Sequence, residues 1–225
     1  MSDPIIRRLA LCAFSASLVQ VSNQESETRW CSKLRVVEVG TPSKKIAGKL
    51  ASYSRGLNEL AVASNSSGRV YQADARELPL RDDEIDLVVT SPPYANSHDY
   101  YLYNKLRLYW LGADVSAIQD AEIGSRNKHS DRKEPIGNYL GAMERCMHEI
   151  RRVLRPGGHA VFVVADAVIR GELFDMGDAF TSMASSSELR KVEHFNFSHK
   201  PMNALFQKDF GSRLSKSTHV LIFEA

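Results

Sequence analysis

The chain has few cysteines and no CxxC pair. Its three cysteines, Cys12, Cys31 and Cys146, lie far apart in a sequence of 225 residues. An odd, scattered set of this kind argues against a disulfide framework or a zinc site and favours free thiols in a reducing compartment. We therefore expect a cytoplasmic protein without a bound metal.

A large excess of charge of either sign is also missing. The 29 Lys and Arg residues face 27 Asp and Glu residues, which gives a formal net charge of +2. With 43% hydrophobic and 25% charged residues, the composition excludes a collagen, a disordered tail and a polytopic membrane protein. The length suits one large domain, with or without an appendage. Any surface for nucleic acid must be a local patch.

Long hydrophobic runs are absent apart from Leu9 to Val19, which follows two arginines. This arrangement has roughly the shape of a secretory signal, which is the alternative interpretation. However, Asp3 and Pro4 look like the start of a helix, and the run is shorter than the roughly 20 residues that span a membrane. We expect a buried helix here and no membrane partner.

Strand and helix patterns alternate through the rest of the chain, which predicts an α/β fold with a mostly parallel sheet and an antiparallel edge strand. IDLVVT at 85–90 and HAVFVVA at 159–165 are typical of buried parallel strands. Apolar residues spaced by 3 or 4 from Ile136 to Leu154 predict an amphipathic helix, and 99–111 predicts an aromatic-rich one. Further strands are expected at 70–73, 192–197 and 219–224, the last two as an antiparallel pair. We expect a helical, basic segment at 1–60 and a main domain at 61–225, with an insert at about 113–137.

The sequence SPPY follows directly after IDLVVT, at Ser91, Pro92, Pro93 and Tyr94. Ligands bind at the carboxyl ends of strands in open α/β sheets, so this loop is a candidate site by its position. A residue before proline is driven to an extended conformation, and proline has no N–H. The motif therefore predicts a stiff turn that presents a hydroxyl, carbonyl oxygens and an aromatic ring. A purely structural turn is the plainer interpretation.

These groups suit a substrate that carries an amino group on a flat ring. The Ser91 hydroxyl and the Pro92 carbonyl could accept the two N–H bonds of the exocyclic amine of cytosine or adenine. The nitrogen lone pair would then point at an electrophilic methyl group, so that positioning and electrostatics carry the catalysis. Tyr94 would stack on the base after it has flipped out of a duplex.

With these residues the chain resembles the amino-group DNA methyltransferases, which modify cytosine N4 or adenine N6. Their signature is Asp, Asn or Ser, then two prolines, then an aromatic residue. The likeness extends over ADARELPLRDDEIDLVVTSPPYANSHDYYLYNKLRLYWLG, EIRRVLRPGGHAVFVVADAVIRGE and HVLIFEA. It implies a Rossmann-like fold that binds S-adenosyl-L-methionine, a catalytic motif at Ser91–Tyr94, and a cofactor adenine facing Asp74 and Ala75. Serine at the first position is similar to the cytosine-N4 enzymes more often than to the adenine-N6 enzymes.

Three further residues are candidates for substrate binding. Tyr100 and Tyr101 could stack on a base, as exceptions in an aromatic helix most of whose residues are explained by packing against the sheet. Asp166 closes the strand HAVFVVA and is either a base or a hydrogen-bond anchor. Two stretches rich in Lys and Arg, 29–55 and 190–216, could contact DNA phosphates, with a solvated face or a protein contact as the alternative.

The glycine-rich cofactor loop of the family is missing. The nearest stand-in, EVGTPS at 38–43, has a single glycine, where close backbone approach needs several. Asp74 lies only 34 positions after Gly40, too few for two βαβ units of about 30 residues each. We expect an incomplete Rossmann-like fold whose first strands and glycine loop come from a second subunit. The alternatives are an adenine-N6 or RNA methyltransferase, and an inactive relative that binds nucleic acid or a protein.

Overall fold

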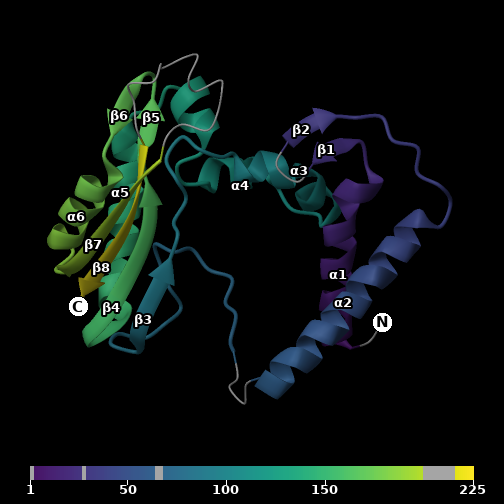
Figure 1. The fold of residues 1–225 in the computed structure, drawn as a ribbon, viewed down its shortest axis with the longest axis horizontal. Helices are drawn as coiled ribbons and strands as arrows, with labels where there is room; N and C mark the ends of the chain where they lie inside the picture. The colour runs from purple at the N-terminus through teal and green to yellow at the C-terminus, as the bar shows by residue number, and fades with distance from the viewer. Residues whose placement is uncertain (1–2, 27–28, 64–67, 200–215) are drawn as a thin grey trace. The chain divides into compact units, whose positions relative to one another are not determined.

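The computed structural model of the chain describes residues 3–26, 29–63, 68–199 and 216–225. They divide into two units, and Figure 1 labels the helices and strands of each. The first unit comprises Met1–Val70 and Tyr100–Glu122, and the second comprises Tyr71–Asp99 and Ile123–Ala225. The sequence interpretation placed residues 100–122 in the main domain, whereas the contacts of the structure place them with the N-terminal segment.

The first unit is mainly helical. Its first helix begins where the sequence predicts, because the Asp3 carboxylate accepts hydrogen bonds from the N–H groups of Ile5 and Ile6 at 2.7 and 3.2 Å. The polar segment after it forms a short antiparallel hairpin. The elements are α1 (Pro4–Leu18), the 3-10 turn η1 (Val19–Val21), β1 (Gln24–Ser26), β2 (Arg29–Ser32), α2 (Thr41–Ala63), α3 (Tyr100–Trp110) and α4 (Val115–Ala121).

The expectation that the first helix is buried is wrong for most of its surface. Only Ala13, Ser17 and Leu18 of α1 are buried, whereas Ile5 is 66% exposed. One face packs within the unit, where Phe14 meets Trp110 of α3 edge to face. By length and composition Pro4–Val21 could also cross a membrane, a property shared by signal sequences and by core helices of soluble proteins.

The second unit contains a four-stranded sheet in the order β3-β4-β8-β7. β3 and β4 are parallel, whereas β8 is antiparallel to both of its neighbours. The expected antiparallel pair is confirmed, whereas a mostly parallel sheet is not: the sheet is mixed, and its antiparallel strand β8 lies between β4 and β7 rather than at the edge. Along the chain, α6 is followed by β7 and then by β8. In the sheet, β8 lies between β4 and β7. The strands are β3 (Ile85–Thr90), β4 (Leu154–Ala165), β7 (Arg190–His199) and β8 (Lys216–Glu224).

Two helices cover one face of this sheet and form the core of the unit. The apolar spacing correctly predicts the longer of them, α5 (Ile136–Val153). Phe162 of β4 contacts Phe180 of α6 and Phe223 of β8, with ring centroids 5.8 and 5.9 Å apart. The remaining elements are the π-helical turn η2 (Asn127–Asp131), α6 (Met176–Ser186) and the hairpin of β5 (Ala167–Ile169) and β6 (Glu172–Phe174).

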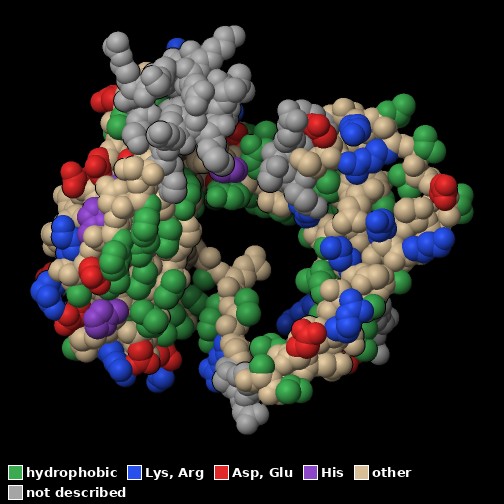
Figure 2. Space-filling model, viewed as in Figure 1, with side chains coloured by type: hydrophobic (Ala, Val, Ile, Leu, Met, Phe, Trp, Pro, Cys, Tyr) green, Lys and Arg blue, Asp and Glu red, His purple; other side chains and the backbone are tan. Residues whose placement is uncertain are grey.

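The opposite face of the sheet is apolar and partly open. The register places Val89, Val161 and Val163 on this face, next to residues of β8 and β7. Val89 is 67% exposed, and Phe197 of β7 is 53% exposed. Figure 2 shows hydrophobic side chains gathered along this part of the unit. Parallel strands in α/β proteins usually have both faces covered, so this face is unusual for its fold class.

The strand predicted at 70–73 does not form, and Val70 is 98% exposed. A strand is stable only beside a neighbour, and the described residues pair β3 with β4 alone. The segment that follows is fastened to α5 instead. Glu149 accepts the N–H of Leu78 at 2.8 Å, and Arg152 donates to the carbonyl of Leu80 at 2.9 Å.

This attachment predicts acid sensitivity. Hydrogen bonds from Arg152 lower the pKa of Glu149 from 4.5 to about 2. A carboxyl whose pKa is lower in the folded state stabilises the fold above its unfolded pKa, and this contribution is lost as the pH falls through the folded pKa. We expect the free energy of unfolding to decrease between pH 4.5 and about 2, and to decrease less in Glu149→Gln.

Urea unfolding at a series of pH values measures this difference. Glu172→Gln, at an exposed position on β6, is the matched control and should behave like the unmodified chain. The same acid dependence in Glu149→Gln as in the control would contradict the prediction.

Candidate active site

The SPPY corner leaves the carboxyl end of β3 and is tied to the neighbouring strand. Ser91 is exposed, Pro92 is buried, and Pro93 and Tyr94 are half-buried. The Ser91 hydroxyl lies 3.3 Å from the carbonyl oxygen of Val163 in β4 and 3.2 Å from the Tyr94 hydroxyl. If its one proton goes to Val163, the serine oxygen keeps two lone pairs. One of them can accept from Tyr94, and the other is available to an incoming N–H group.

The residues after the motif continue the turn by backbone hydrogen bonds. The N–H of Ser97 donates to the Tyr94 carbonyl at 3.3 Å, and the N–H of Asn96 donates to the Gly124 carbonyl at 2.9 Å. The Pro93 carbonyl accepts from the hydroxyl of Tyr139, in α5, at 2.9 Å. The corner is thus held by β4, by α5 and by the segment around Gly124.

Asn96 fastens the far end of the corner. Its φ of 55° lies in the left-handed region, which asparagine tolerates better than most residues. Its side chain donates to the Val168 carbonyl in β5 and accepts from the Ser130 hydroxyl in η2, both at 2.8 Å. The buried Asp99 also accepts the N–H of Asn127, at 2.8 Å. The later part of the predicted insert therefore packs on the SPPY corner.

Asp74 and Ala75 lie in an exposed turn that is closed by an isolated bridge from Asp74 to Glu77. The Arg76 side chain donates to the Asp74 carboxylate at 2.9 and 2.6 Å. These hydrogen bonds are the main cause that lowers the pKa of Asp74 from 3.8 to about 2. The turn can offer a carboxylate to a cofactor, although that carboxylate is already paired with Arg76. Its role toward the cofactor stays a prediction.

Asp166 is 7% exposed and has both carboxylate oxygens engaged. One oxygen accepts from the N–H of Met176 at 3.1 Å and lies 2.9 Å from Nε2 of His219, and the other accepts from Ser217 at 2.8 Å. Asp166, Asp175 and His219 each have one atom that could bind a metal ion, and these three atoms lie within 4.8 Å of one another. The hydrogen bonds already explain this cluster as an anchor that joins β4 to β8 and α6.

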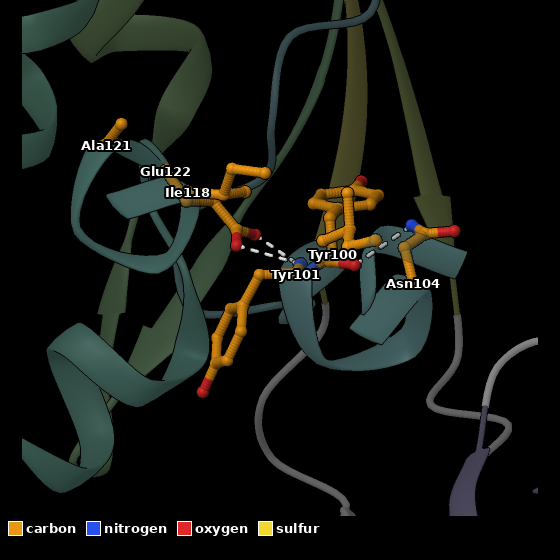
Figure 3. Close-up of a pocket in the computed structure, with 7 residues that line it drawn as sticks. Tyr100, Tyr101, Asn104, Ile118, Ala121 and Glu122 are labelled. Atoms are coloured by element: carbon orange, nitrogen blue, oxygen red, sulfur yellow. Dashed lines mark hydrogen bonds between the residues drawn. The ribbon is translucent and has the colours of Figure 1, made fainter. Parts of the chain in front are cut away.

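Tyr100 and Tyr101 line a cavity of about 390 Å³ in the first unit (Figure 3). The Glu122 carboxylate accepts their backbone N–H groups at 2.7 and 3.1 Å, which satisfies the first turn of α3. The structure therefore brings the two tyrosines together but places them in a different unit from Ser91. Their contact with a substrate stays a prediction. The basic stretch 190–216 includes residues 200–215, which lie outside the described residues.

Sequence reasoning missed three residues that shape this site: Asn96, Gly124 and Tyr139. The only signals in the sequence were an asparagine two positions after the motif and a tyrosine beside the apolar stripe of α5. Neither signal shows which carbonyl its side chain will reach, because those contacts join segments far apart in the sequence.

An exposed SPPY hydroxyl at the carboxyl end of a strand in an α/β sheet is the arrangement that the sequence predicts for an amino-group DNA methyltransferase. The chain belongs to this family, since the family model for DNA methylases, N6_N4_Mtase, matches residues 85–214. The match begins at the first residue of β3 and includes the SPPY corner, α5 and β4. No curated protein matches the chain significantly.

Several solved structures are similar to part of the chain. TTHA0409 of Thermus thermophilus, solved in complex with S-adenosyl-L-methionine, is 21% identical to this chain. The match covers 67% of this chain and 52% of that one, with a TM-score of 0.42. The PvuII DNA methyltransferase, described as cytosine-N4-specific, is 17% identical to this chain. The match covers 72% of this chain and 50% of that one, with a TM-score of 0.45. The chain therefore spans about half the length of these methylases.

Proposed function

We propose that this chain is the target-base half of an S-adenosyl-L-methionine-dependent DNA methyltransferase that acts on an exocyclic amine, with cytosine N4 as the favoured position. The observation that carries the proposal is the exposed Ser91 hydroxyl at the carboxyl end of β3. Its hydrogen-bonding distances to Val163 and Tyr94 leave it able to accept one more N–H group. Membership of the DNA methylase family supports the same chemistry.

In this proposal the corner binds the amine rather than attacking it. The Ser91 oxygen and the Pro92 carbonyl each accept one N–H bond, and the Tyr94 ring stacks on the flipped base. Holding both N–H bonds favours a tetrahedral nitrogen and frees its lone pair for reaction. Serine at the first motif position favours cytosine over adenine as the target base.

When bound, S-adenosyl-L-methionine supplies a sulfonium methyl group: the nitrogen–carbon bond forms while the carbon–sulfur bond breaks, and the electron pair of that bond leaves with the sulfur as a neutral thioether. The chain's own residues hold the amine in line during this transfer. The methylated nitrogen then loses one proton to water, so the corner needs no strong base. This agrees with a corner built from a hydroxyl and carbonyl groups.

The residues of this chain fit the cofactor only in part. The Asp74 turn is exposed and lies beside α5, where Arg145 and Cys146 interact electrostatically with Asp74. The sequence has no glycine-rich loop to let a backbone approach the cofactor closely. We therefore propose a partner polypeptide that contributes that loop and the first strands of the sheet.

Two features of the second unit support such a partner. Within the described residues β3 pairs only with β4, so the other edge of β3 can add a parallel strand. Leu87 and Val89 of β3 are 54% and 67% exposed, which leaves apolar surface beside that edge. Strands and helices from a glycine-loop polypeptide would cover both, as is usual for parallel strands.

A transfer assay tests the proposed function. The chain is co-expressed with a candidate glycine-loop polypeptide from the same organism, and the complex is incubated with DNA and S-adenosyl-L-methionine carrying an isotopically labelled methyl group. Digestion to nucleosides and mass spectrometry then identify the modified base, and RNA serves as a second substrate. The proposal expects labelled N4-methylcytosine. Labelled N6-methyladenine would correct the base, and a stable complex that labels no base would contradict the function.

A further inference from the structure

A turn made of two prolines cannot fix its own carbonyl groups. Neither Pro92 nor Pro93 has an N–H, so the corner lacks two of the backbone donors with which turns normally close. Any carbonyl that must keep a fixed direction here therefore needs a donor from elsewhere in the protein. The peptide carbonyls of the corner include the proposed acceptor of the substrate amine, so their direction matters for the reaction.

Tyr139 supplies such a donor. Its side chain comes from the first turn of α5, is 3% exposed, and donates its hydroxyl proton to the Pro93 carbonyl at 2.9 Å. Burial is the main cause that raises the pKa of Tyr139, with smaller contributions from Cys146 and Tyr94. The hydroxyl therefore stays protonated and keeps its role as a donor at any ordinary pH.

A glycine in the insert makes room for the Tyr139 ring. A Cβ atom placed on Gly124 would lie 2.8 and 2.9 Å from Cδ2 and Cε2 of Tyr139, closer than real Cβ contacts allow. The φ of Gly124 is also +73°, a conformation that side chains disfavour. Because the Gly124 carbonyl accepts the N–H of Asn96, the same residue holds both the ring and the end of the corner.

We propose that Tyr139 is a positioning residue: by binding the Pro93 carbonyl it fixes the orientation of the diproline corner, so that the Pro92 carbonyl and the Ser91 hydroxyl face the amine of the target base. This inference rests on the proposed function for its catalytic consequence. The holding of the corner itself depends only on the contacts of Tyr139 and Gly124. The two parts can therefore be tested separately.

The test uses Tyr139→Phe, which removes only the hydroxyl, and Gly124→Ala, which displaces the ring. Tyr53→Phe, on the half-buried side of α2 and outside the family match, is the matched control. Hydrogen exchange followed by mass spectrometry on the peptide 91–99 reports the corner through the amides of Asn96 and Ser97. Single-turnover methyl transfer by the complex, affinity for S-adenosyl-L-methionine and the melting temperature are measured on the same proteins.

We expect exchange in peptide 91–99 to rise about tenfold in both variants and not in the control. We also expect the single-turnover rate to fall about 10- to 100-fold, while cofactor affinity is unchanged and the melting temperature stays within about 4 °C. Unchanged exchange would overturn the inference whatever the rate does. A parallel loss of stability and cofactor affinity would show a purely structural role and would also overturn it. If the unmodified complex transfers no methyl group, the proposed function fails, and the exchange data alone decide whether Tyr139 holds the corner.

Discussion

Ser91→Ala is expected to lower methyl transfer by the assembled enzyme about 100- to 1,000-fold, the range seen when one preorganised hydrogen-bonding group is removed from an active site. The substitution removes the proposed acceptor for one N–H of the amine. It also removes the hydrogen bonds to Val163 and Tyr94 that hold the corner against β4. Tyr94→Ala is expected to have an effect of similar size, because it removes the ring on which we propose that the base stacks.

The measurement is single-turnover transfer of labelled methyl groups, with circular dichroism and the melting temperature as checks of folding. Ser91 is exposed, so its removal leaves no unpaired group in the core. Tyr94→Phe separates the two contributions of the tyrosine, since it keeps the ring and loses only the contact to Ser91. It should therefore retain far more activity than Tyr94→Ala. Near-normal rates in both Ser91→Ala and Tyr94→Ala would rule out the assigned roles.

The second large effect concerns the partner. Alone, this chain is expected to bind S-adenosyl-L-methionine too weakly for calorimetry to detect and to transfer no methyl group, because it lacks the glycine-rich loop. With the glycine-loop polypeptide, both properties should appear together. Val89→Asp should prevent assembly with the glycine-loop polypeptide, because it places a charge on the apolar surface of β3 that the partner would bury. Val89 is 67% exposed in this chain.

Co-purification and calorimetry compare Val89→Asp with Val62→Asp, a control on α2 at a position that is 90% exposed and outside the family match. The control should form the complex normally. A chain that is monomeric and binds the cofactor tightly by itself would contradict the split arrangement. So would a Val89→Asp chain that assembles as well as the control.

Much of the second unit is readable from local patterns. β3 occupies the run IDLVVT, whose β-branched residues favour a strand, although no residue of β3 is buried as the sequence predicted. α5 spans the apolar periodicity, because this signal arises from burial on one face of a single helix. The position of SPPY at the end of a strand followed from the same information. The start of α1 was readable as well, since the Asp3 cap involves only its immediate neighbours.

The predictions that failed share a physical cause: the local periodicity of a sequence does not show which distant segments pair with one another. The segment at 70–73 has the composition of a strand but has no neighbour to pair with among the described residues. The antiparallel insertion of β8 between β4 and β7 depends on how the chain returns after α6. The contact of Tyr139 with Pro93 spans 46 positions, so a buried tyrosine looked like any other core residue.

The most direct test of the account is a crystal structure of the assembled enzyme with its DNA and a non-reactive analogue of S-adenosyl-L-methionine. We predict a base flipped out of the duplex, with its amine nitrogen about 2.7–3.2 Å from both the Ser91 hydroxyl oxygen and the Pro92 carbonyl oxygen. A base that enters the protein elsewhere, or an amine held by other groups while this corner stays empty, would contradict it.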